Sequence, residues 1–595
     1  MFTTHELTDA ELTSIARGRG GAQAVRKLRA GYRSKLLVIL RALLDAAPTM
    51  PEPLPPLSEA WDLLVEAERA DPAAVTDVLG LPEVQGWAAE TLRLVAATKD
   101  SDQRWRFAGQ LHAVATSAAI RAGVDCEVRI PVLDGVIALP GLGTAALSSH
   151  DHAELVSKSR RVSVRTPDGT LRLPGTLTED GPAWLAQRRV RCVHAGRVLD
   201  VWLDDIQPFR FCGVRPRQRL TVDEVEGWRQ RLDRAWRLLA TEHPDIADEL
   251  AAGMSALVPR TAGNRFRHSS ASTADAFGTM EIAPVDDAAT LASVLIHEFA
   301  HSKLNGVSNL VTLDVEDRRA AFYAPWRDDP RPLHGLLHGA FSFLAVTDFW
   351  QRERHDDPAR NLEFATRRGQ VGSALEAIAA SGLLTDAGEL FVREMRAVAD
   401  TWTDREVDHP VQEIADRVLT DHRATWRIRH LRPSADHVLR VRELRRTGES
   451  WPGDDDAEPE LAPTLEPMVE PRARTHLAQW SLREPATFAA LTDETVVREI
   501  PGATPADLAL VRGDGDRARM LYVRQIEADP RDHRGWIGLG LTTDAHTVLA
   551  CPELVCAVHL AEPGDPAELA GWFGDGVKGS GVARCRSRHG DDAPR

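Results

Sequence analysis

The chain has 595 residues, more than one hydrophobic core usually serves, so we expect about two to four domains. Hydrophobic residues make up 43% of the chain, which favours a folded globular protein and excludes disorder throughout. The formal net charge of −16 argues against general nucleic-acid binding, because that function needs a basic surface.

Neither a membrane span nor a secretion signal is predicted. No apolar run reaches the roughly 18 residues that a transmembrane helix needs. The opening stretch, MFTTHELTDAELTSIARGRG, lacks the charged and then apolar layout of a secretion signal. We therefore expect a cytoplasmic protein that does not bind membranes.

Residues 1–125 are predicted to form a helical N-terminal region. Apolar residues recur there at helical spacing, for example in ELTSIARGRGGAQAVRKLRAGYRSKLLVILRALLDAA. A proline-rich break at 48–57 interrupts the pattern, which then resumes in AWDLLVEAERA and WRFAGQLHAVATSAAIRAG.

From residue 126 the period changes, and alternating apolar residues predict a small antiparallel β region over 126–213. Hairpin turns are expected at 167–169, which reads Pro-Asp-Gly, and at 195–196, which reads Ala-Gly. Three acidic residues near the end of this region are interpreted as solvent-facing rather than as metal ligands: Asp200, Asp204 and Asp205.

Helical spacing returns over 214–448, which we assign to a helical core that contains a candidate metal motif. Thr221 followed by Glu224 has the spacing of a capping box at the start of this core. An acidic, proline-rich stretch at 449–471 predicts an exposed linker.

Residues 472–576 are predicted to form a helical C-terminal region, followed by a disordered tail at 577–595. The stretch 507–541 resembles one helix–turn–helix of tetratricopeptide type, with Asp529 and Pro530 at the turn. Only one such unit is found, so a solenoid is not expected. The whole pattern predicts an α+β protein that is mainly α-helical, with a helical metal-binding core, a small antiparallel β region and a helical C-terminal domain.

The candidate metal motif is His-Glu-x-x-His within VLIHEFAHSKLNG, residues 294–306. On a helix, His297 and His301 lie one turn apart on the same face, so their imidazoles can converge on one ion. Glu298 is rotated by about 100° from His297. In zinc peptidases a carboxylate at that position acts as the general base on a metal-bound water.

Two histidines bind divalent metals poorly, so a third ligand is required. A ligand set with Gly at 304 and His at 307 is excluded, because the chain has Leu304 and Val307. A glutamate ligand of thermolysin type would have to come from Glu316 or its neighbour Asp317, whose surroundings predict a loop.

The next strong helix offers two more candidates for the third ligand, His334 and His338, which also lie one turn apart. We favour His338, because its neighbours Gly339 and Ala340 are small and would allow a close approach. The alternative is that His334 only caps the start of the helix.

The block LIHEFAHSKLNGVSNLVTL, followed by FYAPWRDDPRPLHGLLHGAFSFLAVTDFW, resembles the HExxH-motif domain of systems that modify ribosomally made peptides. The stretches FRHSSASTADAFGTMEIAP and LTDAELTSIARGRGGAQAVRKLRA are also similar to that family. The resemblance extends unevenly over residues 1–550. It is specific at 294–350, where the HExxH motif, the Tyr-Ala-Pro-Trp-Arg segment and the following helix occur in order.

Members of this family are described as iron(II)- and α-ketoglutarate-dependent peptide β-hydroxylases. The resemblance implies Fe(II), α-ketoglutarate and O2 as cofactor and cosubstrates, and a precursor peptide as the partner. Some members are fused to a radical S-adenosylmethionine domain, but this chain has no CxxxCxxC cluster. Such an activity would therefore belong to a separate enzyme of the pathway.

A bound α-ketoglutarate would need a cation for its distal carboxylate, ideally a bidentate arginine. Arg327 and Arg331, in YAPWRDDPRP, are the best candidates. The alternative for either arginine is an ion pair with Asp328 or Asp329. Two further cations are less favoured candidates for binding this carboxylate, Arg267 and Lys303.

Three functions remain open from the sequence. In a hydroxylase, Glu298 would have no obligatory role as a base and would hold a ligand histidine or a water through hydrogen bonds. In a cytoplasmic zinc metallopeptidase, the same residue would be the catalytic base. A peptide-binding scaffold without activity is the third possibility, suggested by the β region and the helical C-terminal region.

Overall fold

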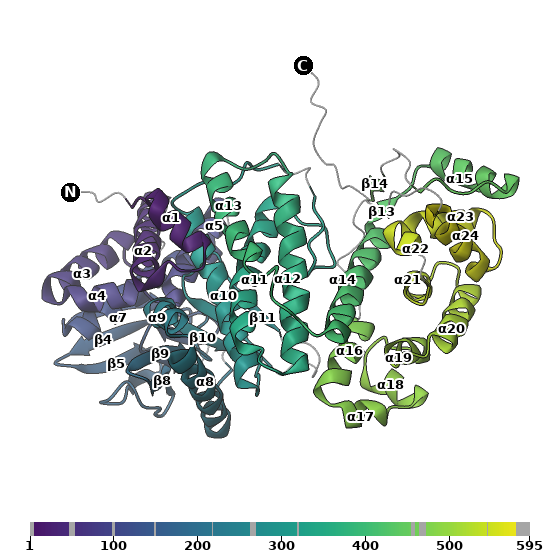
Figure 1. Cartoon of the computed structure of the whole chain (residues 1–595). Coiled ribbons are helices and arrows are strands. Elements are labelled where there is room, and N and C mark those ends of the chain that lie inside the picture. The colour runs from purple at the N-terminus through teal and green to yellow at the C-terminus, as the bar shows by residue number, and fades with distance from the viewer. Residues whose placement is uncertain are drawn as a thin grey trace, which may run out of the picture. The chain divides into compact units, whose positions relative to one another are not determined.

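The computed structural model describes residues 5–46, 54–97, 101–147, 150–216, 218–261, 269–317, 321–453, 459–462, 472–543 and 546–578. The chain folds as two compact units, Met1–Thr312 and Leu313–Arg595. Helices dominate both units and the strands gather in small sheets, which confirms the prediction of a mainly helical α+β protein (Figure 1). Among the described residues, no helix is long and apolar enough to cross a membrane.

The first unit opens with helices, as predicted from the apolar spacing. The Thr8 hydroxyl accepts the Glu11 N–H and the Glu11 carboxylate accepts the Thr8 N–H, which caps the first helix. The helices are α1 (Asp9–Ala16), α2 (Gly21–Ala46), α3 (Leu57–Ala70), α4 (Pro72–Leu79), α5 (Pro82–Ala97), α6 (Ser101–Ala108) and α7 (Gln110–Ala122).

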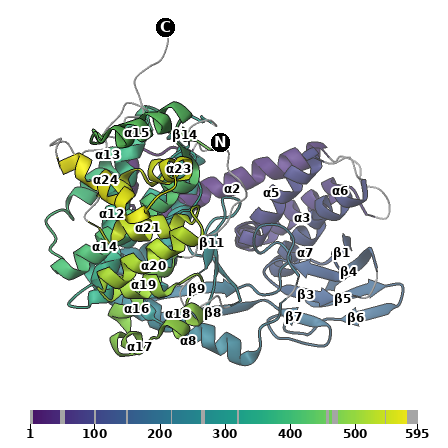
Figure 2. The same cartoon turned by 90° about the vertical axis from the view of Figure 1, so that its right-hand side faces the viewer.

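Two antiparallel sheets follow in chain order (Figure 2). The larger has the strand order β1-β4-β5-β6, and the smaller has the order β2-β3-β7. Thr166 pairs with Gly169, which confirms the turn predicted at 167–169 and makes Gly169 the first residue of the next strand. The strands are β1 (Cys126–Pro131), β2 (Val136–Leu139), β3 (Gly143–Ala146), β4 (His152–Lys158), β5 (Arg161–Thr166), β6 (Gly169–Arg172) and β7 (Trp184–Ala186).

A third sheet has the order β11-β12-β10-β9-β8 and is mixed, because β10 runs parallel to both β9 and β12. Its β8–β9 hairpin turns at Ala195 and Gly196, whose φ angles are 46° and 74°, and this confirms the predicted two-residue turn. The region 126–213 therefore shares a sheet with later strands. The strands are β8 (Arg188–His194), β9 (Arg197–Leu203), β10 (Ala256–Pro259), β11 (Ser270–Ser272) and β12 (Thr279–Ile282).

Two of the aspartates that we interpreted as solvent-facing are buried, so that interpretation is wrong for Asp204 and Asp205, which are 1% and 3% exposed. The Gln207 N–H donates to Asp204 at 3.0 Å, and the Leu220 N–H donates to Asp205 at 2.9 Å. The chain turns inward after β9, and these carboxylates satisfy the main-chain donors of the loop. Asp200 is exposed, as expected.

The rest of the first unit consists of α8 (Val222–Glu242), α9 (Pro244–Gly253) and α10 (Ala288–Ser308). The predicted capping box of Thr221 is present at the start of α8. Helix α10 packs against α2, α8, α9 and β11. Its contact with α2 is close, because a Cβ atom at Gly306 would lie 2.9 Å from the Leu28 Cβ.

The second unit begins with a group of long helices in which α12 contacts α11, α13 and α14. The short strands that follow pair as a two-stranded ribbon. These elements are α11 (Leu333–Glu353), α12 (Pro358–Ala379), α13 (Asp386–Asp400), α14 (His409–His430), β13 (Leu431–Arg432), α15 (Ala435–Thr447) and β14 (Glu460–Leu461).

Short helices make up the remainder of the second unit. The predicted helix–turn–helix is confirmed, because α20 ends at Ala528 and α21 begins at His533, and the Trp536 indole donates to the Pro530 carbonyl in the turn at 3.0 Å. The helices are α16 (Ala473–Arg483), α17 (Pro485–Ala489), α18 (Asp493–Glu499), α19 (Pro505–Val511), α20 (Gly515–Ala528), α21 (His533–Leu541), α22 (His546–Ala550), α23 (Pro552–Ala561) and α24 (Pro566–Lys578).

The predicted linker at 449–471 is described only in part, since 454–458 and 463–471 lie outside the described residues. Within the described part, Trp451 is buried in a core with Phe573, so the start of this stretch packs rather than extends into solvent. The predicted tail lies outside the described residues from position 579 onward.

Candidate metal centre

The HExxH motif lies on α10, as its apolar spacing predicted. The Asp287 side chain accepts the Thr290 N–H at 2.8 Å and so caps the first turn of the helix. Residues on the other faces of the helix are buried, among them Leu295, Phe299 and Leu304. The helix is therefore a core element of the first unit, and its histidines are fixed by the packing around it.

His297 and His301 converge, as predicted. Their Nε2 atoms lie 3.2 Å apart, and their ring planes meet at 87°. Two nitrogen atoms that each lie about 2.1 Å from one ion and 3.2 Å apart subtend about 100° at that ion. This angle falls between the octahedral and tetrahedral values, so the pair fits a divalent metal of either geometry.

The protonation state of His301 also suits a metal. Burial lowers the pKa of His301 to about 4, so its imidazole is neutral near pH 7. When both rings carry their proton on Nδ1, the two Nε2 lone pairs face the same point. A cation at that point stabilises an arrangement in which the lone pairs would otherwise repel each other.

Glu298 is buried beside the histidine pair, with only 3% of its surface exposed. Burial raises the pKa of its carboxyl group, and the hydroxyls of Ser270 and Ser272 on β11 oppose that rise. Among the described residues, Glu298 Oε2 has no hydrogen-bond partner. A buried acceptor of this kind suits a role beside a metal, where it would receive a proton or a hydrogen bond.

The two serines were missed in the sequence analysis. They are separated from the motif by strand β12 and a loop, and their residue type carries no metal signal. Only the pairing of β11 with β12 and the packing of α10 on β11 bring them to Glu298.

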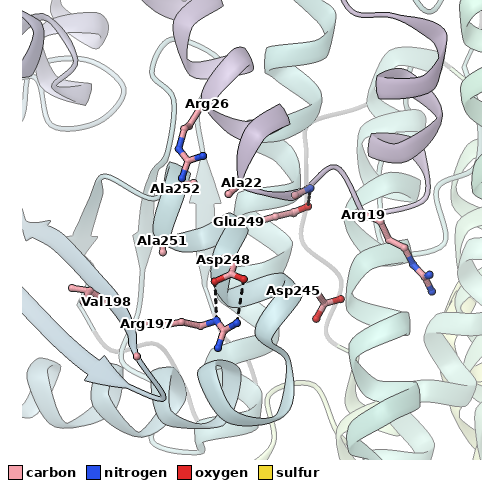
Figure 3. A pocket seen from close by; sticks show the side chains of 13 residues that line it. Arg19, Ala22, Arg26, Arg197, Val198, Asp245, Asp248, Glu249, Ala251 and Ala252 are labelled. Carbon is pink, nitrogen blue, oxygen red and sulfur yellow. Dashed lines mark hydrogen bonds and ion pairs between the residues drawn. The ribbon is translucent and has the colours of Figure 1, made fainter.

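Lys303, a candidate for binding the cosubstrate, forms a buried ion pair with Glu249, with Nζ 2.6 Å from Oε2. The other oxygen of Glu249 accepts the Gly21 N–H, the first of α2, at 2.7 Å (Figure 3). Lys303 therefore ties α10 to α2 and α9. A cavity of about 660 Å³ lies beside this carboxylate, and its charges are mixed, since Arg197 is bound there to Asp248.

The predicted third ligand, His338, lies on α11 of the second unit and is half-buried. Its neighbour His334 does not cap the helix, because α11 begins after Pro332 without a side-chain cap. The His334 Nδ1 instead lies 3.2 Å from the Asp314 carboxylate. Glu316 and Asp317 lie outside helices and strands, as expected.

No group of three or more His, Cys, Asp or Glu side chains within the described ranges is arranged to hold a metal ion. The structure thus brings together His297, His301 and Glu298, while the identity of the third ligand stays a prediction.

Arg327 and Arg331 both pair with Asp329, through contacts of 2.8 Å and 3.3 Å. Partial burial opposes ionisation of Asp329, but the two arginines hold its pKa below the ordinary value. The ion pair that we gave as the alternative is therefore present, and the role of these arginines toward α-ketoglutarate stays a prediction. Arg267 lies outside the described residues.

The Tyr-Ala-Pro-Trp-Arg segment is held by helices that follow it in the second unit. The Tyr323 hydroxyl lies 2.8 Å from the His422 Nδ1, and the Gln370 amide donates to the Pro325 carbonyl at 2.9 Å. The Trp326 ring occupies the space where a side chain at Gly339 would stand, with a Cβ only 2.2 Å away. The absence of a side chain at Gly339, beside His338, thus allows the close approach of the Trp326 indole ring and not of another helix.

No protein-family model matches the chain, and no curated protein matches its sequence. The resemblance to the HExxH peptide-modification family therefore rests on the motifs alone.

Proposed function

We propose that the protein is an iron(II)- and α-ketoglutarate-dependent oxygenase of the cytoplasm that hydroxylates the β-carbon of residues in a ribosomally synthesised precursor peptide. The observation that carries the proposal is the histidine pair of α10, whose Nε2 atoms lie 3.2 Å apart in a half-buried setting, with the His301 imidazole kept neutral by burial, which lowers its pKa. The resemblance of residues 294–350 to the HExxH family supports iron over other metals.

In this proposal His297 and His301 hold the iron through Nε2, and His338 is the third ligand. Bound iron, with the keto acid, would supply the activation of O2 that hydroxylation of an unactivated carbon needs. Arg327 or Arg331 releases Asp329 and binds the distal carboxylate of α-ketoglutarate in its place. Glu298 orients a ligand histidine or a water by hydrogen bonding.

A zinc metallopeptidase is the second candidate, and one observation favours it. Glu298 combines a raised pKa with an oxygen that has no hydrogen-bond partner in the described part of the chain. Those are the properties of a general base that takes a proton from a metal-bound water.

Reconstitution separates the two functions. The protein is loaded with Fe(II) without oxygen, then mixed with α-ketoglutarate, O2 and the short peptide encoded beside its gene. A hydroxylase adds the mass of one oxygen atom to an intact peptide and forms an equal amount of succinate. A peptidase yields new peptide termini with zinc and without α-ketoglutarate, and that result would replace the proposal.

A further inference from the structure

Strand β11 forms one edge of the five-stranded sheet in the first unit and packs against α10, the helix of the HExxH motif (Figure 1). Its residues Ser270, Ala271 and Ser272 pair with Ile282, Glu281 and Met280 of β12. All three residues of β11 are half-buried. The edge therefore lies against the helix of the candidate metal centre, and within the described ranges β12 is the one strand that pairs with it.

The register shows which main-chain groups face outward. The Ala283 N–H donates to the Ser269 carbonyl at 2.9 Å, so Ser269 and Ala283 form a hydrogen-bonded pair. Such pairs alternate in an antiparallel ladder, so the next one joins Ala271 to Glu281. The N–H and C=O groups of Ser270 and Ser272 therefore point away from β12, toward the outer edge.

These outward groups have no hydrogen-bond partner among the described residues. Half-buried main-chain groups without a partner are unfavourable, and they form a template for another strand. The far edge of the same sheet is protected, because β8 carries Arg188, Arg189 and Arg191. β11 has neither a charged residue nor a proline, so nothing in its sequence blocks pairing.

The side chains of Ser270 and Ser272 share one face of β11, and that face lies on Glu298. A strand added to the outer edge would extend this face of the sheet beside Glu298. His297 directly precedes Glu298 on α10 and provides one of the two converging imidazoles. A chain bound at the edge would thus pass the candidate metal centre in an extended conformation.

We propose that the outer edge of β11 binds an extended peptide segment through the main-chain groups of Ser270 and Ser272. A peptide fits because the donors and acceptors repeat at every second residue, as they do along a partner strand. Recognition through the main chain tolerates variation in the side chains of the bound peptide. That the bound segment is the substrate rests on the proposed function; the docking itself does not.

The test uses a matched pair of variants in the full chain. Ser272→Pro removes the outward N–H and keeps an extended backbone, which an edge strand accepts at such a position. Ser272→Ala removes the same hydroxyl and keeps the N–H. The probe is a fluorescein-labelled peptide obtained by selecting a random phage-displayed library against the metal-free wild-type protein.

We expect Ser272→Pro to weaken binding of the probe about tenfold and Ser272→Ala to change it less than about twofold. N-methylation of the probe, scanned along its length, should weaken binding at alternate residues only. This scan uses the wild-type protein, so it decides the question even if Ser272→Pro fails to fold. Equal binding by the two variants, a scan without alternation, or a selection that yields no peptide would each overturn the proposal.

A second copy of the chain could bind the edge of β11 instead of a peptide. Sedimentation of the wild type and of Ser272→Pro tests this alternative by measuring the oligomeric state of both proteins. A wild-type dimer that becomes monomeric in Ser272→Pro would show that a second copy of the chain covers β11, and would also overturn the proposal. Binding is measured without iron or α-ketoglutarate. If the probe binds with the alternating effect of N-methylation but the iron-loaded protein does not hydroxylate a peptide, the result therefore counts against the proposed function alone.

Discussion

Two pairs of histidines with the same spacing differ in almost every other respect. On α10, His297 and His301 direct their Nε2 atoms to within 3.2 Å of each other beside a buried carboxyl group. On α11, His334 and His338 have ring centroids 4.5 Å apart, and His334 is exposed and bound to Asp314. Spacing at one helical turn therefore makes a metal site possible, and the surroundings of the rings decide how it is used.

The largest effect is expected from a substitution that removes one histidine of the α10 pair. His301→Ala removes one of two converging nitrogens, so the affinity for iron or zinc should fall by more than about a hundredfold. His334→Ala is the matched control on α11 and should retain the metal. Metal content after dialysis, measured by mass spectrometry, checks both variants. If His334→Ala lost the metal and His301→Ala kept it, the metal would be bound by the α11 pair and not by the α10 pair.

One glycine on each of the two helices sharpens the comparison. A Cβ at Gly339 would meet the rigid Trp326 ring at 2.2 Å, whereas at Gly306 it would meet Leu28 at 2.9 Å. Gly339→Ala should therefore lower the free energy of unfolding by about 2 kcal/mol, and Gly306→Ala by about half as much. Chemical denaturation followed by circular dichroism measures both. Equal losses would show that the indole moves as readily as the leucine.

The environment of a further histidine, His422, predicts that the free energy of unfolding depends on pH. Burial, and to a lesser extent the charge of Arg472, lowers the pKa of His422 to about 3 in the folded protein. Asp328 lies 4.0 Å from its other nitrogen, and Tyr323 contacts Nδ1. In the unfolded chain an ordinary histidine takes up a proton below about pH 6.5, so stability contributed by neutral His422 is present above that pH and is lost as the pH falls toward 3.

The variant His422→Gln isolates this contribution, because glutamine does not titrate. Between pH 7 and pH 5 the wild type should lose about 2 kcal/mol more of its free energy of unfolding than the variant does. Urea denaturation at the two pH values measures the difference. Parallel losses in both proteins would mean that His422 is protonated without cost in the fold.

The smallest expected effect concerns Glu298. In the proposed hydroxylase, Glu298→Gln removes a positioning group and should lower kcat about tenfold while the metal remains bound. In a peptidase the same substitution removes the base and should abolish turnover. Succinate release and peptide cleavage, assayed side by side, distinguish these outcomes. Ser270→Ala is the control, since it keeps the carboxylate and removes one of the hydroxyls facing it.

Much of the local structure was predictable because it depends on neighbours in sequence. The capping box of Thr221, the turn at Ala195 and Gly196, and the same-face placement of His297 and His301 follow from local geometry. Asp204 and Asp205 could not be placed in this way. Their burial depends on the main-chain donors of the loop that follows β9, and apolar periodicity carries no information about such donors.

The sequence by itself determined the helical class of the protein, the two-residue hairpin turn and the converging histidines, since each of these is fixed within a few residues by dihedral preferences and helical periodicity. Only the tertiary structure decided that Ser270 and Ser272 face Glu298, that Lys303 is bound to Glu249, and that Asp329 pairs with both arginines of its segment. Those contacts depend on how strands pair, how helices pack and which side-chain rotamers the packing allows, and no local pattern of residues encodes them.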